Sequence, residues 1–368
     1  MRKCVFFILP TLLISIAFSF NIGVVIEKNL KSVELVSDSS VTMSYYSNGV
    51  LKTISYSPSQ SLELKYHSKW SAYVNGKLFP LPLTFSSKIG LISIGTVKYR
   101  NRIMIVSNDK DFFIANSLDS EDYLADVMAN FPQNLEIQTY KALAVALRSF
   151  LFALKNLYKN DKYFITSKNK YFPYKGYSNP DKKILYALQT TKNEVLFYKN
   201  NPVYAYYSYD CGGITASAEE IFGYKVGYLQ SVPSPFGSDN SKYTQWTYYY
   251  TYSTLTKIFS HFIKGKITKI YVLSRTKSGR VDTLYIRTTY RSYKIKGEDI
   301  YEWIPRNVLP SLVFSVYKYK DGYKFVGKGY GSGLGLPIYD ANSFAQRGYS
   351  YKDILNHFYP NTTLELLK

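Results

Sequence analysis

The sequence has few of the side chains from which metal sites and disulfide frameworks are built. It contains two cysteines and three histidines in 368 residues. His67, His261 and His357 are scattered, and none has a Cys, His or acidic residue at the spacing of a zinc-ligand pair. We therefore predict no metal site. The absence of a His close to either cysteine in the sequence also argues against a Cys-His catalytic pair.

Acidic side chains are scarce as well. Asp and Glu number 26 against 46 Lys and Arg, which gives a net charge of +20. The positive electrostatic potential of such a chain favours an anionic partner, for example nucleic acid, an anionic lipid surface or an acidic cell-wall polymer. A general Lys-rich and Tyr-rich bias, with 39 tyrosines, explains the same charge without any partner. No dense Lys/Arg run interleaved with aromatic residues is present, so nucleic acid is not a predicted partner.

Long apolar runs are missing except at the N-terminus. A short basic start precedes an apolar stretch over residues 5–18, and small residues follow near position 19. This pattern predicts a secretory signal peptide at residues 1–19, with export across the cytoplasmic membrane to the cell envelope or periplasm. An uncleaved N-terminal anchor is the alternative, although the run is short for a membrane span. Cleavage would remove Cys4 and leave Cys211 alone, so no intrachain disulfide is expected.

Residues 20–117 predict a β-rich N-terminal region. Short apolar runs such as "GVVIE", "LELKYH" and "RIMIVS" alternate with polar turns. The Asn-Gly pairs at 48–49 and 75–76 are typical of two-residue hairpin turns. This region shows no catalytic pattern of its own.

The stretch from residue 121 reads as the end of a strand or loop, a turn at Pro132 and then a long helix that Asn134 can cap. The apolar stripe of this helix is predicted to face the core. Lys141 and Arg148 are seven residues apart on the helix and share a face, where they can either clamp an anion or remain ordinary solvated charges. A strand-rich block follows at 268–317.

Glycines mark two loops farther along the chain. Gly212 and Gly213 predict a tight turn, and "GYGSGLG" lies near the C-terminus. The second loop matches neither the dinucleotide fingerprint nor a phosphate-binding loop, so we predict no cofactor. Its glycines are expected to permit positive φ angles or a close backbone approach.

Several segments over residues 119–364 resemble, in order, the stage II sporulation protein D (SpoIID) family, which also includes amidase enhancers. The matching pieces are "EDYLADV", "KALAVALRSF", "TKNEVLFYKNNPVYAYY", "CGGITASAEEIFG", "YLQSVPSP", "GKGYGSGLG" and "AQRGYSYKDILNHFYP". No single piece is specific for this family, but the occurrence of all of them in this order is. The resemblance implies an α+β fold, with a SpoIID-like mixed domain of long helices packed on β-sheets at 118–365.

The resemblance also implies a cell-wall role. Enzymes of this family are lytic transglycosylases, which cleave peptidoglycan glycan after N-acetylmuramic acid with one carboxyl group as acid and then base. The family carries this acid as a Glu directly before a Met-Pro or similar pair. Here Asn130 takes that position, before Phe131 and Pro132. An amide cannot donate and regain a proton at neutral pH.

Other positions depart from the family pattern in the same direction. Ser208 follows Tyr207 where the family often has His, Ser332 replaces a His between glycines, and Ile338 replaces a Gln. The Cys and His that bind zinc in some members are absent. We therefore expect that the original chemistry has been lost.

Two hypotheses remain open, together with a third in which a surface protein has no connection with glycans. The first is a non-catalytic protein that binds peptidoglycan glycan strands or assists a cell-wall amidase or another envelope protein. The second is an active lytic transglycosylase with a relocated acid, for which Glu136 and Glu121 are weak substitutes. A role in sporulation does not follow. The predicted substrate-binding residues are Lys141, Arg148, Tyr174, Tyr207, Ser208, Gly212, Gly213 and Ser332.

Overall fold

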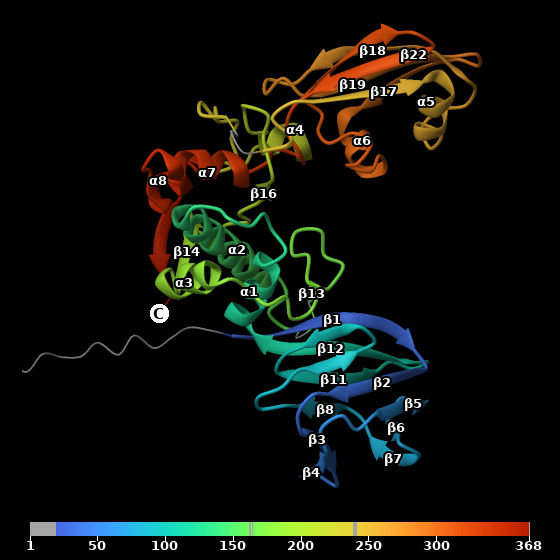
Figure 1. Ribbon diagram of the computed structural model, residues 1–368, viewed down its shortest axis with the longest axis vertical. Coiled ribbons are helices and arrows are strands. Elements are labelled where there is room, and N and C mark those ends of the chain that lie inside the picture. The colour runs from blue at the N-terminus through green and yellow to red at the C-terminus, as the bar shows by residue number, and fades with distance from the viewer. Residues whose placement is uncertain (1–19, 162, 164, 238–240, 368) are drawn as a thin grey trace, which may run out of the picture.

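The computed structural model describes residues 20–161, 163, 165–237 and 241–367, so the predicted signal peptide at 1–19 lies outside the described residues. Three regions follow one another along the long axis (Figure 1): an N-terminal β region, a helical core and a second β region at the opposite end. The predicted α+β class is confirmed.

The N-terminal β region contains two sheets. One has the strand order β13-β1-β12-β11-β8-β3-β4, and the other has the order β10-β9-β2-β5-β6-β7. The bounds are β1 Asn21–Leu30, β2 Ser32–Ser37, β3 Val41–Ser47, β4 Val50–Tyr56, β5 Leu62–Ser68, β6 Ser71–Val74, β7 Lys77–Pro80, β8 Leu83–Ser86, β9 Ile92–Ile94, β10 Val97–Tyr99, β11 Arg102–Ser107, β12 Phe112–Asp119 and β13 Ile165–Thr166.

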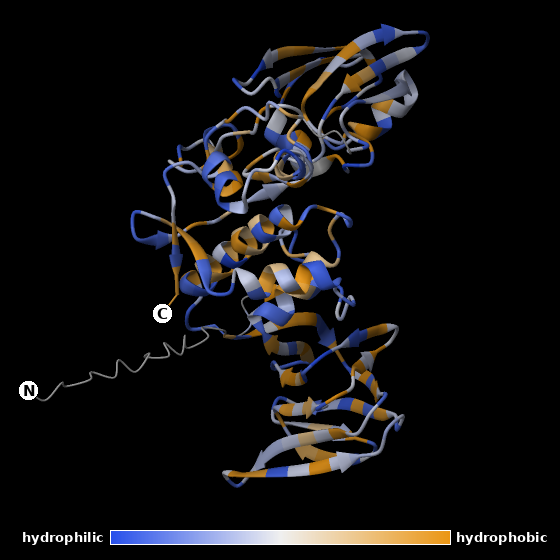
Figure 2. Ribbon diagram, turned by 60° about the vertical axis from the view of Figure 1, so that its left-hand side comes forward, coloured by the Kyte–Doolittle hydropathy of each residue, from blue (hydrophilic) through white to orange (hydrophobic). Residues whose placement is uncertain are grey.

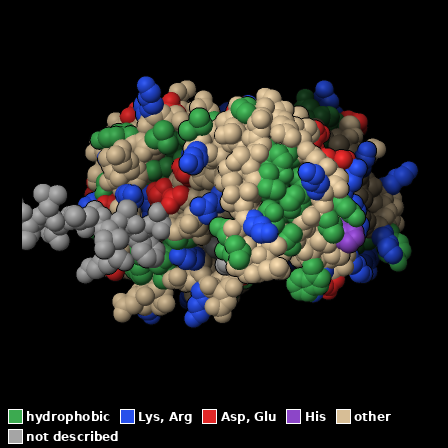
Figure 3. Space-filling model, turned by 90° about the horizontal axis from the view of Figure 1, so that it is seen from below, with side chains coloured by type: hydrophobic (Ala, Val, Ile, Leu, Met, Phe, Trp, Pro, Cys, Tyr) green, Lys and Arg blue, Asp and Glu red, His purple; other side chains and the backbone are tan. Residues whose placement is uncertain are grey.

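The alternation of apolar and polar residues along the sequence explains why these strands form. Leu62 and Leu64 of β5 are buried while the residues between and after them are exposed, and Figure 2 shows the same alternation of hydropathy along neighbouring strands. Both predicted Asn-Gly hairpins are confirmed. Asn48 and Gly49 have φ angles of 50° and 76°, and Asn75 and Gly76 have φ angles of 47° and 78°. Seen from this end of the molecule (Figure 3), Lys and Arg side chains are spread over the surface rather than gathered into one patch.

The helical core packs against the N-terminal β region through one continuous hydrophobic cluster. Short strands pair within it as β15-β14-β24 and β16-β23. Its element bounds are α1 Ser120–Met128, α2 Ile137–Leu157, α3 Lys182–Thr190, β14 Glu194–Tyr198, β15 Asn201–Pro202, β16 Tyr207–Ser208, α4 Ala218–Phe222, β23 Leu336–Pro337, α7 Ile338–Gln346, α8 Tyr351–Phe358 and β24 Thr363–Leu366.

The segment expected to end a strand or loop is helical instead, as α1. Asp119 is its N-cap, and the carboxylate accepts from the backbone N–H of Glu121 at 2.8 Å. Glu121 and Asp122 lie in the first turn, where negative charge is favourable. Tyr123 and Val127 are four residues apart and both buried, a helical period that the acidic start of the segment obscured.

The long helix α2 forms the centre of the core. It is the one helix of the described chain that is long and apolar enough to cross a membrane, but 72% of its apolar window is buried inside the protein. It packs against α3, β14, α7 and α8, as its apolar stripe predicted. The expected cap at Asn134 is wrong: this residue has a φ of 60°, and Glu136 occupies the N-cap position without a capping side-chain bond.

Residues 246–327, called the inserted region here, form a second β unit within the helical core sequence. Its hydrophobic cluster is separate from that of the rest of the chain. The sheets have the orders β17-β22-β21 and β18-β19-β20, which confirms a strand-rich block around 268–317. Its elements are β17 Trp246–Thr251, α5 Tyr252–Ile258, β18 Ile267–Arg275, β19 Val281–Thr288, β20 Ser292–Lys296, α6 Gly297–Trp303, β21 Phe314–Tyr319 and β22 Gly322–Gly327.

The chain enters and leaves the inserted region side by side. The N–H of Gly329 donates to the carbonyl of Tyr243 at 2.8 Å, and the ring of Tyr243 stacks on that of Tyr330 at 4.1 Å between centroids. The indole N–H of Trp246 donates to the Gly329 carbonyl at 3.1 Å. These contacts hold the two crossing segments together at the border with the helical core.

Candidate functional site

A cleft of about 560 Å³ lies between the helical core and the inserted region. Aromatic side chains form most of its walls, and charged groups are few. The lining residues are Lys170, Tyr171, Tyr206, Tyr207, Ser208, Tyr209, Ile221, Phe222, Glu298, Tyr301, Arg306, Tyr330, Gly331, Ser332 and Leu334.

The core wall of the cleft is built on β16, which pairs in parallel with β23. The ring of Tyr207 contacts that of Phe131 at 5.0 Å between centroids, and its hydroxyl donates to the carbonyl of Tyr171 at 3.0 Å. Burial raises the pKa of Tyr207, so its hydroxyl stays protonated. Ser208 is 3% exposed, and its Oγ has no hydrogen-bond partner within the described part of the chain.

Arg280 holds the loops at 211–214 and 331–333, which are called the cleft floor here because Gly331 and Ser332 line the cleft. It lies just before β19, is 2% exposed, and donates from Nε to the Ser332 carbonyl at 2.9 Å. Its Nη1 donates to the Ile214 carbonyl at 2.9 Å, and its Nη2 to the Cys211 carbonyl at 2.8 Å. A residue of the inserted region thus binds the backbone of two loops of the helical core. A fork of rigid donors suits this task better than a flexible ammonium group.

A second link joins the same two regions. Glu220 of α4 accepts from the backbone N–H of Ser278 at 2.9 Å and from its hydroxyl at 2.8 Å. The same carboxylate closes the capping box of α4 with Ser217. The inserted region is therefore held against the core by charge-assisted hydrogen bonds from both sides.

The opposite wall of the cleft comes from the inserted region. Glu298 and Tyr301 lie on α6, and Arg306 follows that helix. The guanidinium of Arg306 lies 4.2 Å from the centre of the Tyr301 ring, and burial lowers its pKa. Among the described lining residues, Glu298 alone carries a carboxylate.

The structure brings three of the predicted site residues, Tyr207, Ser208 and Ser332, into the cleft. Asn130 is partly buried and is not among the residues that line the cleft. Its Nδ2 donates to the Asp126 carbonyl at 2.8 Å and to Ser178 Oγ at 3.0 Å. Only the next residue, Phe131, reaches the cleft wall, through its contact with Tyr207.

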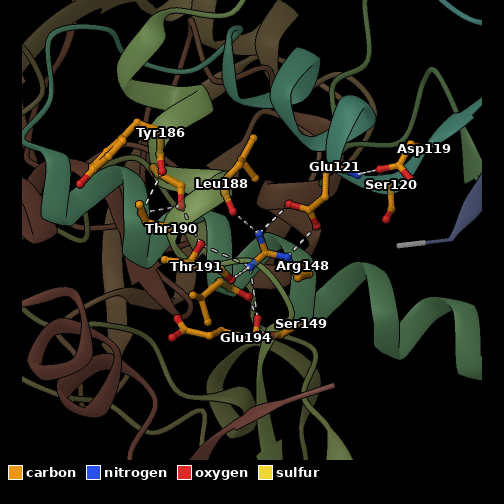
Figure 4. Close-up of polar contacts among 12 residues, drawn as sticks. Asp119, Ser120, Glu121, Arg148, Ser149, Tyr186, Leu188, Thr190, Thr191 and Glu194 are labelled. Carbon is orange, nitrogen blue, oxygen red and sulfur yellow. Dashed lines mark hydrogen bonds and ion pairs between the residues drawn. The ribbon is translucent and has the colours of Figure 1, made fainter. Parts of the chain in front are cut away.

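Arg148 and Glu121 bind each other instead of facing the cleft (Figure 4). The two groups form a bidentate pair, with Nε–Oε1 and Nη2–Oε2 distances of 2.7 Å. Arg148 is 3% exposed, and it also donates to the backbone carbonyls of Thr191 and Glu194 at 2.8 and 3.2 Å. The predictions of Arg148 as an anion clamp and of Glu121 as a relocated acid are therefore corrected: both groups are used in an internal ion pair.

The remaining predicted residues also lie outside the cleft lining. Lys141 stands over the rings of Tyr186 and Tyr351, at 5.2 and 5.9 Å from their centres. Tyr174 is buried, and its hydroxyl donates to Asn116 Oδ1.

Glu136, the other proposed substitute acid, is exposed at the start of α2 and does not line the cleft. Gly212 and Gly213 have φ angles of 73° and 104° and form the turn that presents the Cys211 carbonyl to Arg280. The tight turn that their sequence predicted is confirmed, while neither glycine lines the cleft and their role as substrate-binding residues stays a prediction.

Asp126 is a buried carboxyl group that the sequence did not single out. Arg100 donates to its Oδ1 at 2.8 Å, and the Ser178 N–H donates to the same atom at 3.1 Å. Burial is the larger effect, and it raises the pKa of Asp126 to about 6 in spite of the nearby Arg100. Since the side chain is fully buried, it supports the Asn130 loop and does not reach the cleft.

Most of the cleft lining was not predicted from the sequence, since only Tyr207, Ser208 and Ser332 of its fifteen residues are predicted site residues. The run of tyrosines in "VYAYYSYD" was a usable signal for Tyr206 and Tyr209. No signal indicated Glu298, Tyr301 or Arg306, because residues more than 90 positions from Tyr207 in the chain reach the site only through the fold. Within the described residues, no group of three His, Cys, Asp or Glu side chains could hold a metal ion.

Comparisons with known proteins show what parts of the chain are similar to. Residues 108–198 match the family model described as stage II sporulation protein. Stage II sporulation protein D of Bacillus amyloliquefaciens is 28% identical over 255 residues, which are 65% of this chain and 72% of that protein. Residues 108–198 thus match a domain of the stage II sporulation protein D family, which supports the predicted family. An uncharacterized protein of Brachyspira hyodysenteriae is 27% identical over 283 residues, 75% of this chain and 74% of that one.

Other matches extend beyond the stage II sporulation protein D domain. The amidase enhancer of Bacillus subtilis is 26% identical over 284 residues, 63% of this chain but 39% of the enhancer. Residues 228–335 match a domain of unknown function, DUF8618. That match encloses the inserted region, whose separate hydrophobic core the structure shows.

Proposed function

We propose that this protein binds glycan strands of peptidoglycan in the cleft without cleaving them. The names of its relatives, stage II sporulation protein D and amidase enhancer, support a cell-wall role. The tyrosine-lined walls support a saccharide ligand, because aromatic rings offer apolar faces to sugar rings and hydroxyls to their polar edges. The observation that carries the non-catalytic part is Asn130, an amide that donates to the Asp126 carbonyl and to Ser178 and does not line the cleft.

A protein that only binds glycan needs no proton donor at this position. Transglycosylation requires a carboxyl group within hydrogen-bond reach of the glycosidic oxygen. Glu121 is paired with Arg148, and Glu136 lies outside the cleft lining. A carboxylate that is misplaced by even one ångström recovers little of the rate.

Glu298 favours one alternative, an active lytic transglycosylase, because its carboxylate does line the cleft. Its position on α6 of the inserted region puts it on the wall opposite Tyr207. An enzyme of this kind would form anhydromuramic ends from glycan strands, and the variant Glu298→Gln would abolish them. The binding proposal predicts no such ends in either protein.

The test is to incubate the purified mature protein with peptide-free glycan strands and to measure binding and new chain ends together. We expect binding without new ends. Tyr209→Ala removes one stacking ring, worth about 1 kcal/mol, and should weaken binding about fivefold. Tyr186→Ala, an exposed ring outside the cleft, is the matched control and should bind like the wild type. Absence of binding by the wild type, or turnover that depends on Glu298, would refute the proposal.

Export to the cell envelope and assistance to a wall amidase are parts of the same proposal. The predicted signal peptide at 1–19 supports export, and the amidase enhancer relative supports an amidase partner. Mass spectrometry of the N-terminus from the envelope fraction tests the first. The rate of a purified wall amidase on sacculi, with and without this protein, tests the second.

A further inference from the structure

Arg306 is a cation in the cleft for which the described residues supply no anionic partner. No carboxylate of the described residues lies within 4.0 Å of its guanidinium, although Arg306 follows directly after the acidic helix α6. Arg306 is partly buried in the cleft lining, and this burial lowers its pKa. A desolvated charge is normally paired, because an unpaired one is costly. The partner of Arg306 is therefore to be sought in the ligand.

The surroundings of Arg306 match a ligand that carries a carboxylate. The guanidinium lies 4.2 Å from the centre of the Tyr301 ring, and because it has five N–H donors, this one neighbour leaves donors for a second group. Ser208 on the facing wall has an unpartnered, buried Oγ. Lys170 adds a second positive charge to the lining, and Glu298 supplies the one negative charge among the described lining residues.

We propose that Arg306 binds a carboxylate of the saccharide, so that the cleft selects an acidic glycan over a neutral glycan of the same linkage. This proposal rests on the proposed function, and it makes Arg306 the residue that determines the specificity of the cleft. Arginine and carboxylate form two parallel hydrogen bonds, which fix the orientation of the sugar as well as its charge. A neutral glycan displaces water from the guanidinium without replacing those bonds, and it should bind about 10- to 100-fold more weakly.

Three ligands separate the possible sources of the carboxylate. Chitin oligosaccharides have the same β-1,4 linkage and no carboxylate. Peptide-free glycan strands carry the free lactyl carboxylate of muramic acid. Strands with intact stem peptides carry peptide carboxylates while the lactyl group is an amide. Tight binding of the second or the third ligand, relative to chitin, identifies the group that Arg306 binds.

The experiment is isothermal titration calorimetry, which measures the affinity of these ligands for the full mature chain and for two variants. Arg306→Gln should lower the affinity for the preferred acidic glycan about 10- to 100-fold and leave the weak chitin affinity unchanged. Arg291→Gln is the matched control, since Arg291 also stands over tyrosines of the inserted region, Tyr290 and Tyr293, but does not line the cleft. It should bind like the wild type.

Two further measurements keep the result interpretable. Arg306→Lys retains the charge without the planar fork, so intermediate affinity is expected, with thermal unfolding as the check on folding. The selectivity of the wild type for acidic glycan over chitin tests the proposal even when a variant is unstable. Equal wild-type affinity for chitin and acidic strands, or unchanged affinity in folded Arg306→Gln, would overturn this inference and leave glycan binding intact. Failure of the wild type to bind any strand would overturn both.

Discussion

Replacing Arg280 with methionine tests whether one buried side chain holds the inserted region and the cleft floor together. Methionine keeps the apolar stem but removes every donor. Three backbone carbonyls, those of Cys211, Ile214 and Ser332, then lose a charge-assisted hydrogen bond in a site that is 2% exposed. Each buried acceptor left without a partner costs about 1–3 kcal/mol. Because water can reach some of these groups after the loops relax, we expect a total loss of about 3–5 kcal/mol.

Thermal unfolding and hydrogen exchange measure this effect. A loss of that size should lower the unfolding midpoint by on the order of 10 °C. Amide exchange should accelerate in the loops at 211–214 and 331–333, where the three carbonyls lie, more than in α2. Arg275→Met is the matched control, because Arg275 also donates to a backbone carbonyl, that of Phe314, but is exposed at the end of the adjacent strand β18. It should cost about 1 kcal/mol.

The result that refutes the reasoning is specific. If Arg280→Met unfolds within about 1 °C of the wild type and the two loops keep their exchange rates, the hydrogen bonds of Arg280 do not hold the cleft floor. An equal loss in the Arg275 variant would point instead to the stability of the inserted region as a whole.

Four other changes test separate parts of the structure. Glu121→Gln leaves the buried Arg148 without its counter-charge and should cost about 3–5 kcal/mol, measured as the free energy of unfolding in denaturant. Because the folded-state pKa of Asp126 is raised to about 6 from 3.8, its contribution to stability is full below about pH 4 and is lost as the pH rises through 6. Asp126→Asn should therefore show a smaller fall in unfolding temperature between pH 4 and pH 7 than the wild type. Asn130→Glu alone should produce no anhydromuramic ends, because position 130 points to the Asp126 carbonyl and does not line the cleft; new ends would contradict the placement of that side chain. Gly333→Ala should destabilise by about 1–3 kcal/mol, since φ is +76° and a Cβ there overlaps the guanidinium of Arg280; a neutral effect on thermal unfolding would show that the loop can move aside.

Local patterns predicted the β-rich N-terminal region well, because strand alternation and Asn-Gly turns depend on neighbouring residues. The hairpin at Asn75 and Gly76 follows from the positive φ angles that these residue types tolerate. The helix α1 was missed because its acidic first turn hides a buried face that is defined by packing on α2, α3 and β12. The α+β class and the family were both predictable, since ordered motifs along the chain carry them.

The candidate site was predictable only on its core wall. Tyr207, Ser208 and Ser332 belong to motifs and were found. Arg148 also belongs to a motif, yet its role is an internal ion pair, because motif membership does not tell which way a side chain faces. Arg306 could not be found, since its proximity to Tyr207 depends on how the inserted region docks against the core.

The side-by-side crossing at Tyr243 and Gly329 has a consequence for how such a protein can be altered. A unit with its own hydrophobic core and adjacent chain ends can be exchanged as a cassette, with a short connector or a different module in its place. Because one wall of the cleft belongs to this cassette, the proposed function predicts that a swap changes the preferred polymer, provided that the new module keeps donors like those of Arg280 and Ser278 for the loops of the core. One stretch of the polypeptide thus supplies both a wall of the cleft and the contacts that hold that wall to the scaffold.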